Sequence, residues 1–169
     1  MFGGFSLKTI QPASNLASTG ITREFSMSEL GKTGLETSVL CANVHHRTEL
    51  KLIQYNGLLQ RLFHARIDEE SQIISLLFAD GISTTIETID YTVIGVDAFR
   101  VMKLVVDFST MQYVRLLIDK TEYDLTPYSG FTGVISQQRN YLANVRLATR
   151  TAFANTQYCG HMIITGNEP

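Results

Sequence analysis

The stretch KLVVDFSTMQYVRLLIDKTEYDLTP, from Lys103 to Pro127, decides the fold. It holds three short runs rich in Val, Leu, Ile and Tyr, separated by polar breaks at Ser109-Thr110 and at Asp119-Lys120-Thr121. Short β-prone runs between turn residues predict strands, so this stretch predicts a three-strand antiparallel meander.

Alternation along these strands assigns their faces. One face of the first strand carries Met102, Leu104, Val106 and Phe108. On the second strand, one face carries Val114, Leu116 and Ile118, and the opposite face carries Tyr113, Arg115, Leu117 and Asp119. On the third strand, Tyr123 and Leu125 point inward, whereas Glu122 and Asp124 point outward. The acidic residues are therefore spread over turns and an outer face. We interpret the stretch as scaffold rather than as an acidic site.

The rest of the chain repeats this pattern and shows no sustained helical periodicity. The predicted strands are Phe5–Ile10, Ile21–Met27, Glu36–Val44, Glu49–Tyr55, Leu58–Asp68, Gln72–Ala79, Ile82–Thr88, Phe99–Phe108, Met111–Asp119, Tyr123–Thr126, Tyr141–Thr151 and Gln157–Thr165. Asn56-Gly57 and Asp80-Gly81 are hairpin signals, the first typical of a type I′ turn, whereas 11–20 and 128–140 read as loops. Roughly a dozen short strands without crossover helices predict an all-β, antiparallel two-sheet sandwich.

Composition limits the class of protein. The 169 residues, 44% hydrophobic and 18% charged, fit one domain over 1–169, either a whole protein or a fragment or compact variant of a larger one. A net charge of −2 does not indicate the basic surface that nucleic-acid-binding proteins usually have. No apolar run approaches the length of a membrane span. The compartment is left open. Cys41 and Cys159 are expected to be two buried free thiols rather than a disulfide.

Several segments together resemble the concanavalin A-like lectin/glucanase superfamily, which includes laminin-G-like domains. GGFSLKTI resembles the opening strand of such modules, MKLVVDFSTMQYVRLLIDKTEYDL resembles their central hairpin, and YCGHMIITGNEP is similar to their last strand. FHARIDEESQIISLLFADG supplies a paired stretch between them. The chain departs from the family in this last strand, where Gly160 or His161 stands in place of the usual Asp. The resemblance implies a jelly-roll sandwich and a carbohydrate-related role.

The strand 58–68 carries the most polar face, with Leu62, His64, Arg66 and Asp68 on one side. A guanidinium beside a carboxylate could bind sugar hydroxyls or a carboxylated ligand. The alternative is a solvent-facing row whose charges pair across strands. The aromatic ring of Tyr113 and the guanidinium groups of Arg115 and Arg146, on other strands, are further candidates for ligand binding. The predicted ligand-binding residues are His64, Arg66, Asp68, Tyr113, Arg115 and Arg146.

Catalytic and metal sites are not expected. Laminarinase-type hydrolases need three acids at alternate positions, E-x-D-x-E, whereas Asp68, Glu69 and Glu70 are consecutive. His45 and His46 point in opposite directions on a strand and, with the remote His64 and His161, give no metal spacing, so they are expected to be surface or loop residues. No cofactor is expected, with structural calcium at the Asp80, Asp97 or Asp119 turns as the alternative.

Three functions remain. The first is a non-catalytic carbohydrate-binding or recognition module, although the absence of Trp counts against it. The second is a structural or assembly subunit acting through edge strands and loops. The third, a glycoside hydrolase, is disfavoured because no catalytic constellation was found. The expected partner is a glycan or another protein, with a homo-oligomer open, and neither nucleic acid nor a membrane.

Overall fold

The computed structural model describes residues 7–11, 18–25, 31–41, 46–77, 83–88, 99–137, 139–149 and 155–169. Within these ranges the chain forms strands and no helix, and accordingly the described part contains no helix that could cross a membrane. The strands are β1 Leu7–Gln11, β2 Ser18–Phe25, β3 Lys32–Cys41, β4 His46–Tyr55, β5 Leu59–Asp68, β6 Ile73–Leu77, β7 Ser83–Thr88, β8 Arg100–Asp107, β9 Gln112–Ile118, β10 Thr121–Asp124, β11 Phe131–Val134, β12 Asn140–Thr149 and β13 Asn155–Gly166.

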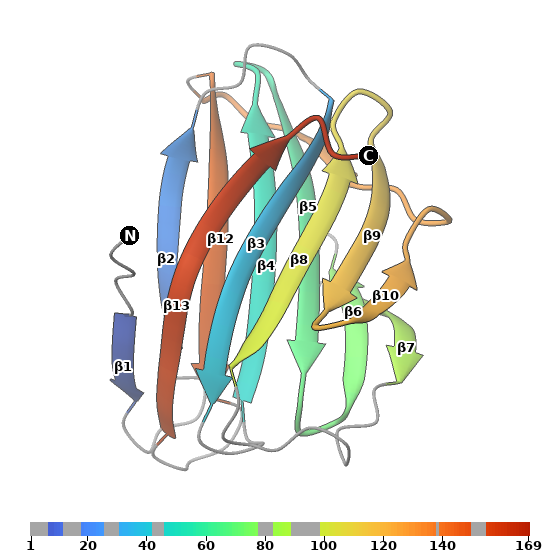
Figure 1. Ribbon diagram of the computed structural model, residues 1–169. Helices are drawn as coiled ribbons and strands as arrows, with labels where there is room; N and C mark the ends of the chain where they lie inside the picture. Colours follow the sequence, from blue (N-terminus) through green and yellow to red (C-terminus); the bar gives the residue numbers. More distant parts are fainter. Residues whose placement is uncertain are drawn as a thin grey trace.

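The strands form two antiparallel sheets that pack face to face (Figure 1). The six-stranded sheet has the order β1-β13-β3-β8-β9-β10, and the seven-stranded sheet has the order β2-β12-β4-β5-β6-β7, with β11 also paired to β5. The predicted all-β two-sheet sandwich is confirmed. Non-consecutive neighbours, such as β12 between β2 and β4, bring residues distant in sequence onto one sheet face.

The core lies between the sheets and is built around aromatic rings. The ring of Phe63 stands edge-on to those of Phe108 and Tyr113, with both centroid distances at 5.1 Å. Aliphatic side chains from both sheets surround this group, among them Leu35, Leu50, Leu52, Ile67, Leu104, Leu116 and Val145. Edge-to-face packing adds stabilisation beyond the burial of apolar surface.

The meander from Lys103 to Pro127 forms as predicted, as β8, β9 and β10 with turns between them. The predicted apolar face of β8 is buried in the core. The prediction for Tyr113 is wrong, because it lies in the core at 1% exposure rather than beside Arg115. The pairing slips between Val105 and Val106, which pair with Arg115 and Tyr113. This β-bulge reverses the alternation at Val114 and turns Tyr113 inward.

Two loop predictions are also corrected. The stretch 128–140 contains β11, which pairs with β5 through Phe131 and Leu62. The β4–β5 turn has a positive φ only at Gly57, and the Asn56 side chain accepts hydrogen bonds from Leu58 N and Leu59 N. It is therefore an Asx-type turn rather than type I′. The turn at Asp80-Gly81 lies outside the described residues, although β6 and β7 pair as a hairpin predicts.

Candidate functional site

The candidate site lies on the outer face of the seven-stranded sheet, the side turned away from the six-stranded sheet. On β4, Leu50 and Leu52 point into the core, so the alternating residues Arg47, Glu49 and Lys51 point outward. Register then places Glu49 opposite Arg66 of β5 and opposite Arg146 of β12.

Glu49 is the centre of this face and is only 1% exposed. Its two carboxylate oxygens are contacted by nitrogen atoms from three strands. The pairs are Arg47 Nε at 3.2 Å, His64 Nε2 at 3.4 Å, and Lys51 Nζ, Arg66 Nε and Arg146 Nη1 each at 3.6 Å. We call these six residues the Glu49 cluster. Four permanent cations and one imidazole thus share one carboxylate.

This environment lowers the pKa of Glu49 from 4.5 to about 2. Burial acts in the opposite direction and raises the pKa, since it disfavours the charged form. Contact with His64 and the charges of Lys51 and Arg146 more than offset burial. The carboxylate is therefore ionised throughout the neutral range and cannot act as a proton donor there.

The basic members of the cluster are electrostatically crowded. Burial lowers the pKa of His64 below 6.5, and contact with Glu49 only partly restores it. Burial, followed by the charge of Arg47, lowers the pKa of Arg66. Both shifts mean that the positive forms are disfavoured, chiefly because burial removes them from water, and the neighbouring charges of Lys51 on His64 and of Arg47 on Arg66 act in the same direction. An additional anion would relieve this crowding.

The structure brings together four of the six predicted ligand-binding residues. His64, Arg66 and Arg146 belong to the Glu49 cluster. Asp68 follows on the same side of β5, interacts electrostatically with Arg66 and accepts a hydrogen bond from Ser71 N at 3.0 Å. Its neighbour Glu69 does not join it, because Glu69 Oε1 lies 2.8 Å from His46 Nε2.

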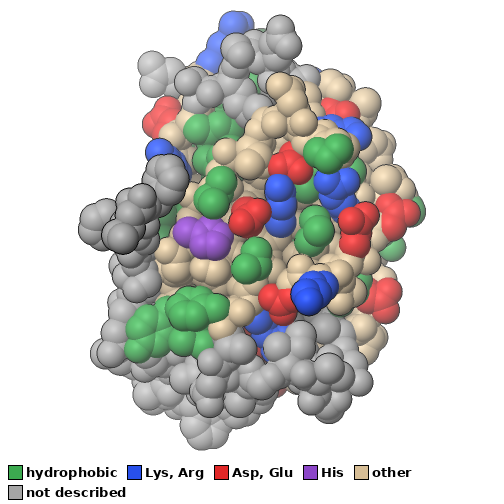
Figure 2. All heavy atoms as spheres, in the orientation of Figure 1, with side chains coloured by type: hydrophobic (Ala, Val, Ile, Leu, Met, Phe, Trp, Pro, Cys, Tyr) green, Lys and Arg blue, Asp and Glu red, His purple; other side chains and the backbone are tan. Residues whose placement is uncertain are grey.

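Tyr113 and Arg115 do not join this group. The Tyr113 hydroxyl accepts a hydrogen bond from His64 N at 2.8 Å inside the core, and burial raises its pKa to about 12. Arg115 lies on the outer face of the six-stranded sheet, where it contacts Glu168 at 3.7 Å and donates to Pro169 O. Figure 2 shows that face, on which acidic and basic side chains are interspersed. The predicted set therefore spans three environments.

Sequence reasoning missed Glu49, Arg47 and Lys51. The signal was present in RTELKL, residues 47–52, where charged residues alternate with Thr48, Leu50 and Leu52. Such alternation indicates one charged face and one buried face. That side chains of β5 and β12 meet at Glu49 depends on how these strands pair with β4, and the sequence of residues 47–52 does not determine that pairing.

The histidine prediction is partly wrong. His46 is fully buried, and its Nε2 lies 2.8 Å from Glu69 Oε1, because the even-numbered residues of β4 point toward the core. His45 lies outside the described residues. Cys159 is a buried free thiol whose pKa is raised, first by burial.

Metal ligands are not grouped in the part of the chain that the structure describes, which holds no cluster of three or more His, Cys, Asp or Glu side chains. Asp119 accepts a hydrogen bond from Val101 N at 2.9 Å. Asp80 and Asp97, the other turns considered for calcium, lie outside the described residues.

Solved structures share this fold at very low sequence identity. The Bacillus licheniformis beta-glucanase matches with a TM-score of 0.52 and 7% identity over 96% of this chain and 78% of that one. The laminarinase catalytic domain from Thermotoga maritima matches with 0.54 and 10%, over 100% and 80%. A pseudo beta-1,3-glucanase of Mycobacterium tuberculosis matches with 0.52 and 7%, over 96% and 75%. No protein-family model and no curated protein matches the sequence.

These neighbours correct the predicted function. The expectation of a non-catalytic module is contradicted, since the structures that share the fold include glucanases and laminarinases. That expectation depended on the missing E-x-D-x-E pattern, which tests only one catalytic arrangement. The same fold is also found in a protein named as an immunostimulatory antigen and pseudo beta-1,3-glucanase. The predicted architecture, in contrast, is confirmed: the chain has the fold of a two-sheet, concanavalin A-like jelly-roll sandwich.

Proposed function

We propose that the protein recognises an anionic glycan on the outer face of its seven-stranded sheet. The ligand class is suggested by fold neighbours named as a beta-glucanase and as endo-1,3-beta-glucanases, or laminarinases. Fold similarity alone is associational support. The charge of the ligand is argued from the side chains of the Glu49 cluster.

The convergence of four cations on one buried carboxylate carries the proposal. Even when Asp68 is added to the cluster, its four permanent cations outnumber its two carboxylates. The outer parts of these side chains reach solvent, since Lys51 is 24%, Arg66 25% and Arg146 38% exposed. They can therefore contact an incoming anion while Glu49 holds them in place.

A carboxylate or sulfate group on a sugar fits this arrangement. Guanidinium groups bind such anions through parallel hydrogen bonds, which are stronger when both partners are charged. A neutral sugar supplies no counter-charge and would leave Arg66 and Arg146 as crowded as before. The site is therefore expected to discriminate by the charge of the glycan.

Isothermal titration with a defined β-1,3-glucan hexamer and its sulfated derivative tests the proposal. We expect the sulfated hexamer to bind and the neutral hexamer to bind this face much more weakly. Arg66→Gln and Arg146→Gln should each weaken binding by roughly tenfold, because one charge-assisted hydrogen bond is lost. Arg115→Gln, the matched change on the opposite sheet, should leave affinity unchanged.

Two controls separate glycan recognition from other processes. Poly-glutamate of equal charge should bind more weakly than the sulfated hexamer, and equal binding would reduce the site to a general polyanion surface. New reducing ends are measured in the same incubation, which reports cleavage separately from binding. If Arg66→Gln and Arg146→Gln leave the affinity for the sulfated hexamer unchanged, or if Arg115→Gln weakens it equally, the proposal is contradicted.

A further inference from the structure

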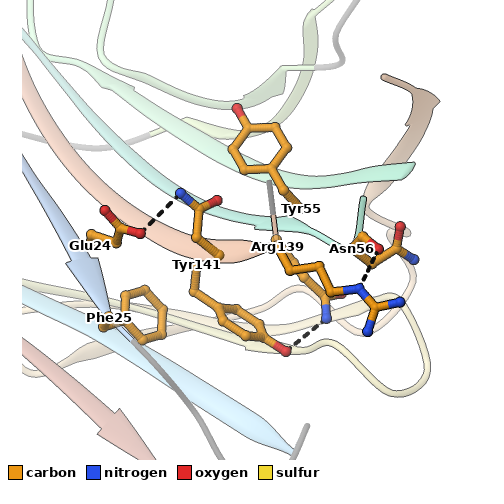
Figure 3. Close-up of a pocket in the computed structure, with 8 residues that line it drawn as sticks. Glu24, Phe25, Tyr55, Asn56, Arg139 and Tyr141 are labelled. Atoms are coloured by element: carbon orange, nitrogen blue, oxygen red, sulfur yellow. Dashed lines mark hydrogen bonds between the residues drawn. The ribbon is translucent and has the colours of Figure 1, made fainter. Parts of the chain in front are cut away.

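A separate cavity of about 750 Å³ opens at one end of the seven-stranded sheet (Figure 3). It lies where β2 and β4 end and β12 begins, because register pairs Tyr141 with Phe25 and with Gln54. Its volume is within the range of small-ligand sites. It is lined by Glu24, Phe25, Gln54, Tyr55, Asn56, Arg139, Asn140 and Tyr141.

One wall of the cavity is aromatic and fixed. The Tyr141 hydroxyl accepts a hydrogen bond from Gln54 Nε2 at 2.7 Å. The Tyr141 ring lies 5.5 Å from that of Phe25 and stands edge-on to Phe108 at 5.7 Å. Tyr55 stands on the other side of the cavity (Figure 3). The ring of Tyr141 is thus held by contacts on several sides and needs no rearrangement to meet a ligand.

Among the described residues that line the cavity, the charged groups are balanced, with one carboxylate and one guanidinium. Glu24 Oε1 accepts a hydrogen bond from Asn140 Nδ2 at 3.2 Å. Arg139 donates through Nε to Asn56 O at 3.0 Å, which fixes the guanidinium and leaves its terminal nitrogens without a hydrogen bond among the described residues. Asn140 Oδ1 is buried and likewise has no hydrogen-bond partner there. The described lining therefore offers the terminal nitrogens of Arg139 as donors and the oxygens of Glu24 and Asn140 as acceptors.

We propose that this cavity binds one neutral sugar ring. The C–H face of a sugar is apolar and packs on aromatic rings such as Tyr55 and Tyr141, while its hydroxyl groups both donate and accept hydrogen bonds. Glu24 accepts from such hydroxyls and Arg139 donates to them. An acidic ligand would meet Glu24 as a like charge, so the balance of charge favours a neutral one.

This site is distinct from the Glu49 cluster and does not rest on the function proposed for it. Tyr55 and Glu49 point to the same side of β4, but six residues separate them, or about 20 Å along an extended strand. A single sugar ring cannot contact both. The two sites differ in charge as well, and each can be disabled by variants that leave the other intact.

Ligand-observed NMR and titration with neutral disaccharides test this inference, with cellobiose, laminaribiose, maltose and lactose as the probes. We expect at least one to bind, Tyr55→Ala to weaken that binding by roughly fivefold or more, and Tyr55→Phe to retain it because the ring remains. Arg139→Ala should weaken it as well. Circular dichroism and urea unfolding establish that each variant is folded.

Arg66→Gln serves as the control that separates the two sites. It should leave disaccharide binding unchanged even if it abolishes binding of the sulfated hexamer. The inference is overturned if none of the four probes binds, if Tyr55→Ala binds as the wild type does, or if Arg66→Gln weakens binding equally. Tighter binding of a uronic acid disaccharide in the cavity would overturn its assignment to a neutral sugar.

Discussion

Replacing Glu49 with glutamine should destabilise the fold strongly, although Glu49 lies on an outer face. The substitution preserves size and shape and removes only the negative charge. The cations around it would then repel one another with no counter-ion in a position that is 1% exposed. Removing one partner of a buried ion pair costs about 3–5 kcal/mol for this reason.

The magnitude follows from the pKa of Glu49. It falls from 4.5 to about 2 on folding, and each pKa unit corresponds to about 1.4 kcal/mol. The ionised carboxylate therefore stabilises the folded state by about 3 kcal/mol at pH 7. Because the folded-state pKa is lowered, this contribution is complete above about pH 4.5 and is lost as the pH falls toward 2. Less than half of it remains at pH 3.

Urea unfolding of the wild type and Glu49→Gln at pH 7 and pH 3 measures this directly. The difference in unfolding free energy should be about 3 kcal/mol at pH 7 and less than half of that at pH 3. Glu36→Gln is the control on the other sheet, since Glu36 is 28% exposed and pairs with Lys103 at 3.9 Å. It should cost under about 1 kcal/mol. A Glu49→Gln effect as small as that of Glu36→Gln, or an equal effect at both pH values, would refute the reasoning.

Three further predictions concern buried groups. Tyr113→Phe should lower the unfolding free energy by about 1 kcal/mol in urea, because the bond to His64 N is lost, and an unchanged midpoint would contradict this. The pKa of His64 is lower in the folded state, so the unfolded state binds more protons and the unfolding free energy should fall as the pH drops below 6.5. The variant His64→Gln should reduce this dependence on pH. An unchanged dependence would contradict the lowered pKa of His64. In a Cys41→Ser background, Cys159 should react with a thiol reagent only in denaturant, and rapid native reaction would contradict its burial.

The fold could be predicted because alternation and turn residues are local signals. The apolar face of β8 and the inward positions of Tyr123 on β10 and of Leu125 just after it follow from period-two patterns alone. Tyr113 was misplaced because the bulge opposite Val105 and Val106 arises from pairing between strands. The strand β11 was missed because four residues, FTGV, with a central glycine, give little β signal.

The site could be predicted only in part, for a similar reason. His64, Arg66 and Asp68 share a strand face, and one segment is enough to find them. Their anchor, Glu49, lies on β4, and the cluster forms only when β4 is placed between β5 and β12. Charge alternation in one segment therefore indicates a polar face, whereas sheet order decides which charges meet.

Amide chemical-shift mapping with the sulfated β-1,3-glucan hexamer tests the central claim most directly. The largest shifts should fall in residues 47–51 of β4, in residues 64–66 of β5 and around Arg146 of β12, where the Glu49 cluster lies. Largest shifts on β3, β8 or β13 of the six-stranded sheet, or no shifts at a high excess of the hexamer, would contradict recognition of an anionic glycan at this face.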